Sequence, residues 1–487
     1  MKILKDILYK AGIEDVIGPT NVAIDSLYFD SRDVKGYSLF VAIPGEQVDG
    51  HEYIEMALEK GAIAIVCETL PEVVHGGITY IKVSDSAKAL AEIAGNFYDH
   101  PSEKLNLIGV TGTNGKTTCV TLLWQLFTAM GHNCGLISTV VNRIGKDEIP
   151  ATHTTPNVVL LNRLLARMVD EGIEYCFMEV SSHALVQHRV TAVDFKIGLF
   201  TNITHDHLDY HKTFDEYIKA KKIFFDQLAK EAIAIVNHDD PHSEIMVQNS
   251  KATSRTYAVK SFADFKAKII ENQFSGIHVL LDGNDLYTKM IGSFNAYNIL
   301  AVYATAISLG KDKLEVLTQI SRLNPVEGRF QHLRTEKNVS AIVDYAHTPD
   351  ALKNVLKTIL DISTGNEKII TVIGCGGNRD RKKRPIMAKI ACEFSDKVIF
   401  TSDNPRNEKP EAILKDMTAG VEGIHFKKTL TISDRRDAIK AACDMAYPGD
   451  VVLVAGKGHE KYQEINGVRH PFDDFEIVQE TLKMLEK

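Results

Sequence analysis

The segment 105–118 reads LNLIGVTGTNGKTT, which is the pattern of a strand, a glycine-rich turn and the first residues of a helix. Its apolar beginning predicts the strand, and the apolar segment 120–130, which is followed by Gly131, predicts the helix. Glycines in such a turn let successive backbone N–H groups face phosphate oxygens, and the helix N-terminus adds a favourable dipole. The segment therefore predicts a phosphate-binding loop in an α/β domain.

The polar residues of this loop predict its chemistry. Lys116 is expected to neutralise β- and γ-phosphates, and the hydroxyl of Thr117 is expected to coordinate Mg²⁺. The general pattern places its first glycine at position 110, where this chain has Val110, so we do not expect the common GTPase or kinase branches. The predicted nucleoside-triphosphate site consists of Gly112, Thr113, Asn114, Gly115, Lys116, Thr117 and Thr118.

Two downstream segments are rich in metal-ligand side chains. The apolar strand predicted at 173–178 ends in Glu179, where a carboxylate of the same sheet could hold Mg²⁺, although an ordinary strand-end charge is an equal alternative. Residues 204–211 read THDHLDYH and nearly match the HxHxDH pattern of binuclear zinc hydrolases, but Tyr210 stands where the last histidine is needed. A loop of surface histidines that bind no metal is another alternative for this segment. A magnesium role would require a further oxygen donor nearby, because Mg²⁺ prefers oxygen to histidine nitrogen.

Composition narrows the classes of partner. The 487 residues include 56 Lys+Arg and 64 Asp+Glu, which gives a formal net charge of −8 and no overall field for nucleic acid or an anionic membrane. The start, MKILKDILYK, lacks the apolar core of a signal peptide, and no apolar run approaches ~18 residues. The seven cysteines are scattered and form no CxxC pair. We expect a cytoplasmic protein with small-molecule substrates, no nucleic acid and no membrane insertion.

The order of apolar runs predicts an α/β protein of three domains. The pattern resets near His100 and again at 325–335, and short apolar runs alternate with helix-like segments on each side of both points. The last part is typical of a doubly wound, Rossmann-like sheet. The expected domains are a small α/β domain at 1–100, a central phosphate-loop domain at 101–331 and a Rossmann-like domain at 332–487.

Short motifs along nearly the whole chain resemble those of the Mur ligases, which build the peptide stem of bacterial cell-wall precursors. The motifs are DSR (30–32), GTNGKTT (112–118), EVSSHAL (179–185), DHLDYH (206–211), GSFNAYN (292–298), EGRF (327–330), DYAHTP (344–349) and GKGHE (456–460). The resemblance implies an ATP-dependent amide ligase, in which a substrate carboxylate attacks the γ-phosphate and an amine then displaces phosphate from the acyl phosphate.

The resemblance also implies the substrates. It implies addition of meso-diaminopimelate to the D-glutamate of UDP-N-acetylmuramoyl-L-alanyl-D-glutamate. It also implies the order of the domains along the chain: a nucleotide-sugar domain, an ATPase domain and an amino-acid-binding domain. A sister ligase that uses L-lysine, a folylpolyglutamate synthetase, a zinc hydrolase and a non-enzymatic ATP-binding regulator remain alternatives. We expect a monomer.

The resemblance implies a set of catalytic and metal-binding residues. Lys116, Lys221, His207 and Glu179 are the expected catalytic residues, with Thr117 and Glu179 on one Mg²⁺ and His207 and a carbamylated Lys221 on a second. Carbamylation would convert an ammonium into the missing oxygen donor. Lys221 and Lys222 are adjacent, and only the family spacing Y-x-x-A-K selects Lys221. Further implied ATP contacts are Asn295, Asn298, Arg329 and Asp344.

The remaining implied residues bind the two other substrates. Those for the UDP-muramoyl dipeptide are Phe29, Ser31, Glu46, Gln47, Val48, Thr154, Thr155, Ser181, Gln187 and Arg189. Those for diaminopimelate are Arg379, Asp403, Asn404, Pro405, Arg406, Gly456 and Glu460. The planar guanidinium of Arg189 suits the tail carboxylates. Arg406 would pair with the distal carboxylate of diaminopimelate and repel the distal ammonium of lysine, while Glu460 suits the amino group.

Overall fold

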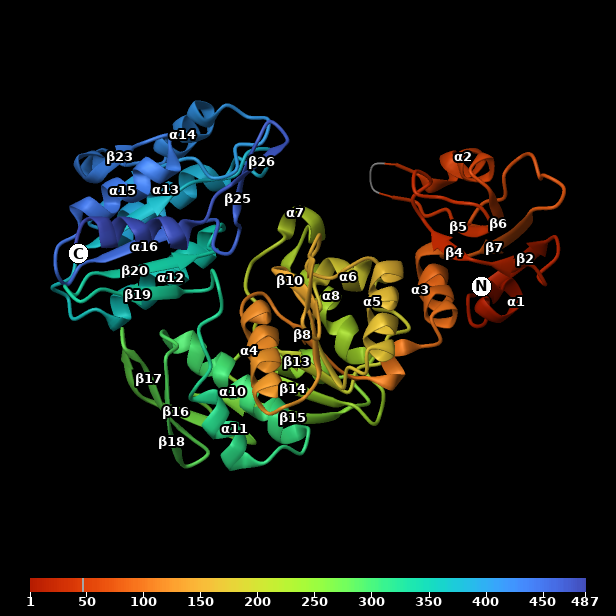
Figure 1. Ribbon diagram of the computed structural model, residues 1–487, viewed down its shortest axis with the longest axis horizontal. Helices are drawn as coiled ribbons and strands as arrows, with labels where there is room; N and C mark the ends of the chain where they lie inside the picture. Colours follow the sequence, from red (N-terminus) through yellow and green to blue (C-terminus); the bar gives the residue numbers. More distant parts are fainter. Residues whose placement is uncertain (46–47) are drawn as a thin grey trace. The chain divides into compact units, whose positions relative to one another are not determined.

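The computed structural model describes residues 1–45 and 48–487 (Figure 1). The chain divides into two compact units. The first unit comprises Met1–Tyr257, Ser261–Asp264 and Ala304–Lys311, and the second comprises Ala258–Lys260, Phe265–Tyr303 and Asp312–Lys487.

The first unit begins with a five-stranded sheet of order β2-β7-β6-β5-β4, in which β2 is antiparallel to β7 and the other neighbours are parallel. Apolar residues form a core cluster on each of its faces. The strands are β2 (Ile13–Ile17), β4 (Ser26–Tyr28), β5 (Ser38–Val41), β6 (Ala62–Cys67) and β7 (Thr79–Val83). The other elements are β1 (Lys2–Ile3), α1 (Leu4–Ile7), β3 (Ala23–Ile24), α2 (Ile54–Glu59) and α3 (Ser86–Phe97).

A second sheet of the first unit carries the predicted phosphate loop. Its order is β11-β10-β9-β12-β8-β13-β14-β15, with parallel pairing from β9 to β15 and antiparallel pairing at β10 and β11. The strands are β8 (Asn106–Thr111), β9 (Cys134–Ile137), β10 (Val141–Ile144), β11 (Asp147–Pro150), β12 (Tyr175–Glu179), β13 (Ile197–Phe200), β14 (Ile233–Asn237) and β15 (Thr253–Ala258). The helices are α4 (Lys116–Ala129), α5 (Val158–Asp170), α6 (Ser182–Val186), α7 (Leu208–His211), α8 (Phe214–Asp226) and α9 (Ser243–Val247).

Helix α8 packs closely on this sheet because two strands have glycines beneath it. A Cβ at Gly109 would lie 2.6 Å from the ring of Phe224, and a Cβ at Gly198 would lie 3.1 Å from the same ring. The buried face of α8 is formed by Tyr217, Ala220, Lys221, Phe224 and Phe225. This spacing is that of one face of an α-helix, so a lysine is held among apolar residues by the helical repeat itself.

The second unit contains an antiparallel meander, a six-stranded sheet of order β19-β20-β24-β21-β22-β23 that is parallel except at β19, and an antiparallel pair, β25-β26. The strands are β16 (Phe265–Gln273), β17 (Gly276–Leu281), β18 (Asn284–Thr288), β19 (Gln331–Arg334), β20 (Ser340–Asp344), β21 (Ile369–Ile373), β22 (Lys397–Phe400), β23 (Thr429–Thr431), β24 (Val451–Ala455), β25 (Tyr462–Ile465) and β26 (Val468–Pro471). The helices are α10 (Ser293–Ser308, which ends in the first unit), α11 (Lys313–Ile320), α12 (Pro349–Ile362), α13 (Lys383–Phe394), α14 (Pro410–Thr418), α15 (Arg435–Met445) and α16 (Asp474–Met484).

Helices cover both faces of the six-stranded sheet. Residues of α12, α13 and α14 share one apolar cluster with the sheet, and residues of α15 and α16 share another. This is the expected doubly wound arrangement, and the predicted three-domain α/β class is confirmed. The domain boundaries at residues 100 and 331 stay predictions.

All seven cysteines are free and buried. Burial raises the pKa of the Cys67 thiol to about 11 and those of Cys134, Cys375 and Cys443 to about 12. No helix in the described part of the chain is both long and apolar enough to cross a membrane.

Candidate active site

The phosphate loop joins β8 to α4 and is fastened to the end of β13. Gly112 has φ 146°, and a Cβ there would lie 2.0 Å from Oγ1 of Thr201, so the position requires glycine. The backbone N of Thr113 donates to the carbonyl oxygen of Asn202 at 2.8 Å. Thr201 Oγ1 donates to the carbonyl oxygen of Asn114 at 2.6 Å. Neutral hydrogen bonds to the residues that follow β13 therefore hold the loop in place.

The side chains of two lysines meet at this loop. Lys116 Nζ donates to the carbonyl oxygens of Gly112 and Thr113 at 2.9 and 2.8 Å. Lys221 Nζ donates to the carbonyl oxygen of Gly112 at 2.8 Å, from a side chain that is 1% exposed. Burial lowers the pKa of Lys221 well below its usual range, and the charge of Lys116 lowers it further. Lys222 instead pairs with Asp226 at 2.5 Å.

The predicted oxygen ligands of one Mg²⁺ lie together. Thr117 Oγ1 donates to Oε2 of Glu179 at 3.1 Å, and both side chains are buried. The other carboxylate oxygen, Oε1, accepts from the backbone N and Oγ1 of Thr139 at 2.8 and 3.1 Å. A hydroxyl and a carboxylate held this way are hard oxygen donors, which fit Mg²⁺.

His207 lies on the exposed side of the same region. Its φ is 52°, its side chain is 47% exposed, and its Nε2 lies 3.6 Å from Oδ2 of Asp206. Its ring centroid lies 6.2 Å from that of Tyr217, whose hydroxyl is 3.1 Å from Thr113 Oγ1. His211, by contrast, is buried, with Nε2 2.9 Å from Ser182 Oγ.

The zinc-hydrolase alternative finds no support in this arrangement. Among the side chains that the structure describes, which do not include that of Asp209, no group of three or more His, Cys, Asp or Glu residues has the geometry of a metal site. Tyr210, at the position where the zinc pattern needs a histidine, has its hydroxyl 3.2 Å from Gln187 Nε2.

The residues predicted for the dipeptide tail form a bonded group next to Glu179. Thr155 Oγ1 donates to the carbonyl oxygen of Glu179 at 2.8 Å and accepts from Ser181 N at 3.0 Å. Arg189 donates to the carbonyl oxygen of Thr155 at 2.8 Å and to Oε1 of Gln187 at 2.6 Å. Its pKa is lowered by burial, and the described residues place no carboxylate within bonding distance of it. A charge held this way suits an incoming carboxylate. Thr154 lies in the same group, accepting from Thr139 Oγ1 at 3.1 Å.

The residues predicted to bind the nucleotide sugar do not form a bonded group of this kind among the described residues. Phe29 is 37% exposed and Val48 53%, whereas Ser31 is buried with its hydroxyl 3.5 Å from Met56 Sδ. Glu46 and Gln47 lie outside the described residues.

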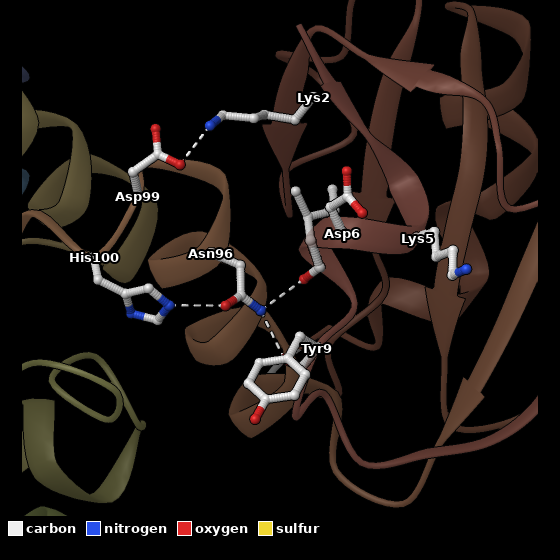
Figure 2. A pocket seen from close by; sticks show the side chains of 8 residues that line it. Lys2, Lys5, Asp6, Tyr9, Asn96, Asp99 and His100 are labelled. Carbon is white, nitrogen blue, oxygen red and sulfur yellow. Dashed lines mark hydrogen bonds and ion pairs between the residues drawn. The ribbon is translucent and has the colours of Figure 1, made fainter.

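A depression of about 510 Å³ lies elsewhere, between α1 and the end of α3 (Figure 2). Asn96 Nδ2 donates to the carbonyl oxygens of Ile7 and Tyr9 at 2.9 and 2.6 Å, and Lys2 pairs with Asp99 at 2.5 Å. These bonds join α1 to α3, and no predicted substrate contact lines the depression.

In the second unit, the predicted ATP contacts lie in two places, the first turns of α10 and the segments next to β19 and β20. Asn298 Nδ2 donates to Asn295 Oδ1 at 2.9 Å in the first turns of α10, where both are buried. Asp344, at the end of β20, accepts from the backbone N of Phe330 and Ala346 at 2.7 and 2.8 Å, and burial raises the pKa of its carboxyl. The guanidinium of Arg329 lies 4.7 Å from the ring centroid of Tyr345.

The predicted amino-acid loops follow β21, β22 and β24 and are tied to one another. Arg406 has φ 50°, and its Nη1 donates to the carbonyl oxygen of Gly377 at 2.8 Å. Arg379 is exposed. A Cβ added at Gly376 would lie 3.7 Å from Cγ of Arg379 and 2.9 Å from Nη1 of Arg406. The two guanidinium-bearing side chains therefore pass close to one glycine.

The other members of this set lie at the same strand ends. Asn404 Nδ2 donates to Oε2 of Glu460 at 2.7 Å. A Cβ at Gly456 would lie 2.5 Å from Oδ2 of Asp403, so only glycine leaves room for that carboxylate. Pro405 is buried beside them.

Sequence reasoning missed the charged residues that support these loops. Lys457, without exposed surface, bonds to Asn404 and Glu460. Arg435 and Asp474, both fully buried, pair at 2.6 Å, and Arg435 also donates to the carbonyl oxygen of Ala455. Lys457 is part of the GKGHE motif, so the sequence offered a way to find it. Arg435 and Asp474 are 39 residues apart, and no local sequence pattern indicates that they pair.

A further missed group supports the Gly376 loop. Arg384, without exposed surface, pairs with Glu408 at 2.8 Å and with Asp416 at 2.9 Å. Glu408 also accepts from the backbone N of Asn378 at 2.5 Å. These bonds connect the loop after β21 to the loop after β22.

Comparison with known proteins places this arrangement in a family. Family models described as "Mur ligase family, catalytic domain", "Mur ligase middle domain" and "Mur ligase, glutamate ligase domain" match residues 23–98, 110–306 and 328–458. A protein of Cytophaga hutchinsonii named UDP-N-acetylmuramoyl-L-alanyl-D-glutamate--2,6-diaminopimelate ligase is 55% identical over 99% of this chain and 100% of its own. A protein of Bacteroides thetaiotaomicron with the same name is 51% identical over 98% and 99% of the two chains.

A solved structure of a ligase with that name superposes with a TM-score of 0.69 at 31% identity, covering 99% of each chain. Three family models in order and relatives that match from end to end lead to one conclusion. The chain belongs to the Mur ligase family.

Proposed function

We propose that the protein is the ATP-dependent ligase that adds meso-diaminopimelate to the D-glutamate of UDP-N-acetylmuramoyl-L-alanyl-D-glutamate, in the synthesis of peptidoglycan precursors. The full-length relatives carry this name. The observation that supports the chemistry is that Nζ of Lys116 and Nζ of Lys221 both bond to the carbonyl oxygen of Gly112 in a glycine-rich loop. The ammonium group of Lys116 at this place suits the charge that develops on a transferring phosphoryl group.

The donor set fits Mg²⁺, which would neutralise phosphate charge and polarise the reacting oxygens when bound. Thr117 and Glu179 would hold one ion. His207 and Lys221 would serve the second, provided that Lys221 is carbamylated. The lowered pKa of Lys221 favours the neutral amine, and only that form attacks CO₂ to make an N–C bond with loss of a proton. The resulting anion would supply the oxygen donor that His207 lacks.

The substrate carboxylate would attack the γ-phosphorus of ATP, giving an acyl phosphate and ADP. Gly112 to Thr118 would bind the phosphates, with Asn295, Asn298, Arg329 and Asp344 contacting the rest of the nucleotide. Arg189, held by Thr155 and Gln187 without a carboxylate partner among the described residues, would fix the dipeptide tail together with Thr154 and Ser181. The nucleotide sugar would contact Phe29, Ser31, Val48, Glu46 and Gln47 in the first domain.

The amine of diaminopimelate would then attack the acyl phosphate and release phosphate. Arg406 and Arg379 would bind the distal carboxylate and Glu460 the distal amino group, with Asp403, Asn404, Pro405 and Gly456 shaping the pocket. Lysine lacks that carboxylate, so it would not make these charge-assisted hydrogen bonds, and its distal ammonium would be repelled by the two guanidinium groups.

We further propose a cytoplasmic monomer. The buried free thiols suit a reducing compartment, and every substrate contact proposed above comes from one chain. The domain limits 1–100, 101–331 and 332–487 belong to the same proposal.

Phosphate release from ATP tests the function directly. With UDP-N-acetylmuramoyl-L-alanyl-D-glutamate present, meso-diaminopimelate should stimulate release and L-lysine should stimulate it far less. Equal or greater stimulation by lysine would refute the amino-acid assignment, and no stimulation by either amine would refute the ligase assignment.

A further inference from the structure

We propose that Lys457 is a positioning residue that sets amino-acid specificity: its buried ammonium balances the charge of Glu460 and so prevents the site from favouring a bare distal ammonium. The inference deepens the proposed function and rests on it. In this view, two features select diaminopimelate over lysine. One is contact with Arg406, and the other is the balance between the charges of Lys457 and Glu460.

Lys457 closes a triangle with two predicted substrate contacts. Its Nζ donates to Asn404 Oδ1 at 2.9 Å and to Glu460 Oε2 at 3.1 Å, and Asn404 Nδ2 donates to the same Oε2 at 2.7 Å. The Lys457 side chain has no exposed surface, whereas that of Glu460 is 16% exposed. Lys457 therefore acts on a bound amino acid through Glu460 and Asn404.

Two neighbouring arginines occur in ion pairs. Arg406 lies 3.8 Å from Glu464, which also donates its backbone N to Asn404 Oδ1 at 2.9 Å. Arg435 and Asp474 pair at 2.6 Å. Asp403 and Glu460 both act on Arg435 electrostatically. Replacing Lys457 with a neutral residue would leave Glu460 as an uncompensated carboxylate, whose field is poorly screened away from water.

The two candidate amino acids respond differently to such a charge. The distal end of meso-diaminopimelate carries an ammonium and a carboxylate and has no net charge. The distal end of lysine carries an ammonium alone. An uncompensated carboxylate therefore attracts lysine strongly and diaminopimelate weakly, so Lys457 lowers affinity for the wrong substrate.

The test is a charge series measured as the ratio of kcat/KM for L-lysine to kcat/KM for meso-diaminopimelate. Lys457→Met should raise this ratio at least about tenfold. The reason is that one uncompensated charge attracts the distal ammonium of lysine at an effective dielectric constant of about 20. Lys457→Arg, which keeps the charge, and the double variant Lys457→Met/Glu460→Gln, which removes both charges, should give a ratio close to that of the unaltered protein. The double variant should lose kcat/KM for both amines, because Glu460 is a predicted substrate contact. Glu460→Gln alone, which leaves the ammonium unbalanced, should lower the ratio. Lys440→Met, a surface lysine of α15 that is 47% exposed, is the matched control.

A structural role alone would not produce this order. Equal loss of kcat/KM for both amines in Lys457→Met, or the same raised ratio in the double variant, would overturn the inference. If Lys457→Met does not fold, an unchanged ratio in Glu460→Gln overturns it as well. Failure of the unaltered protein to turn over either amine would instead refute the proposed function.

Discussion

The phosphate loop and the amino-acid loops lie at the same kind of place, the carboxyl ends of parallel strands, but they are stabilised differently. The phosphate loop is held by neutral hydrogen bonds from Thr201 and Asn202, and its two lysines donate to backbone carbonyls. The amino-acid loops are held by ion pairs such as Arg435–Asp474 and Lys457–Glu460. The phosphate loop is thus held through bonds to backbone groups, whereas the amino-acid loops are held through paired charges.

The strongest test of this difference removes one charge from a buried pair. Asp474→Asn leaves the Arg435 guanidinium buried without its carboxylate and should lower the free energy of unfolding by about 3–5 kcal/mol in urea titrations. Glu480→Gln on the same helix is the control, because its pair with Arg436 is 3.8 Å long and exposed. That variant should change stability by less than about 0.5 kcal/mol. Similar losses in both variants would contradict the idea that burial makes the pair important.

The corresponding change in the phosphate loop should separate activity from stability. Lys221→Met should reduce diaminopimelate-dependent phosphate release by on the order of 10²–10³-fold. It should leave the free energy of unfolding equal or higher, because an apolar side chain replaces a buried amine whose charged form is disfavoured by burial. Lys222→Met, which removes only the pair with Asp226, should keep nearly full activity. Equal activity loss in the two variants would contradict the assignment of Lys221.

A third change asks whether the amino-acid loops act on one substrate alone. Arg406→Met should raise KM for meso-diaminopimelate by about 10–100-fold, the value of a lost charge-assisted hydrogen bond, and leave KM for ATP unchanged. Lys409→Met removes an exposed cation three residues away and should change neither. A parallel rise in both Michaelis constants for Arg406→Met would indicate general damage to the unit.

The smallest expected effect is the pH dependence of the Arg384–Glu408 pair. The hydrogen bond from Arg384 lowers the pKa of Glu408 to about 2, below its value in the unfolded chain. The pair therefore contributes stability that is complete above about pH 4.5 and is lost as pH falls toward 2.

Glu408→Gln should accordingly cost about 1–2 kcal/mol at pH 6, after allowance for a side chain that is 25% exposed, and progressively less between pH 5 and pH 3. Urea unfolding of both proteins across this range measures the difference. Glu411→Gln, at an exposed position of α14, serves as control. A cost that stays constant with pH would contradict the assigned role of the carboxylate.

The two regions also differed in how far the sequence predicted them. The phosphate loop is contiguous, so strand, glycines, Lys116 and Thr117 could all be predicted from one segment. The choice of Lys221 over Lys222 had a usable signal, because Tyr217, Ala220 and Phe224 place residue 221 on the apolar face of α8. The supports of the amino-acid loops had none. Asn404 and Lys457 are 53 residues apart, and Arg384 and Glu408 meet only through the packing of separate elements.

The burial of all seven cysteines has a practical consequence for experiments on this protein. Thiols with pKa values near 12, such as those of Cys134 and Cys443, present almost no thiolate at neutral pH and react slowly with maleimides. A single cysteine placed on the surface, for example at Lys440, would therefore take a fluorophore selectively in the native background. A dye attached in this way would report on its own unit without the need for a cysteine-free variant.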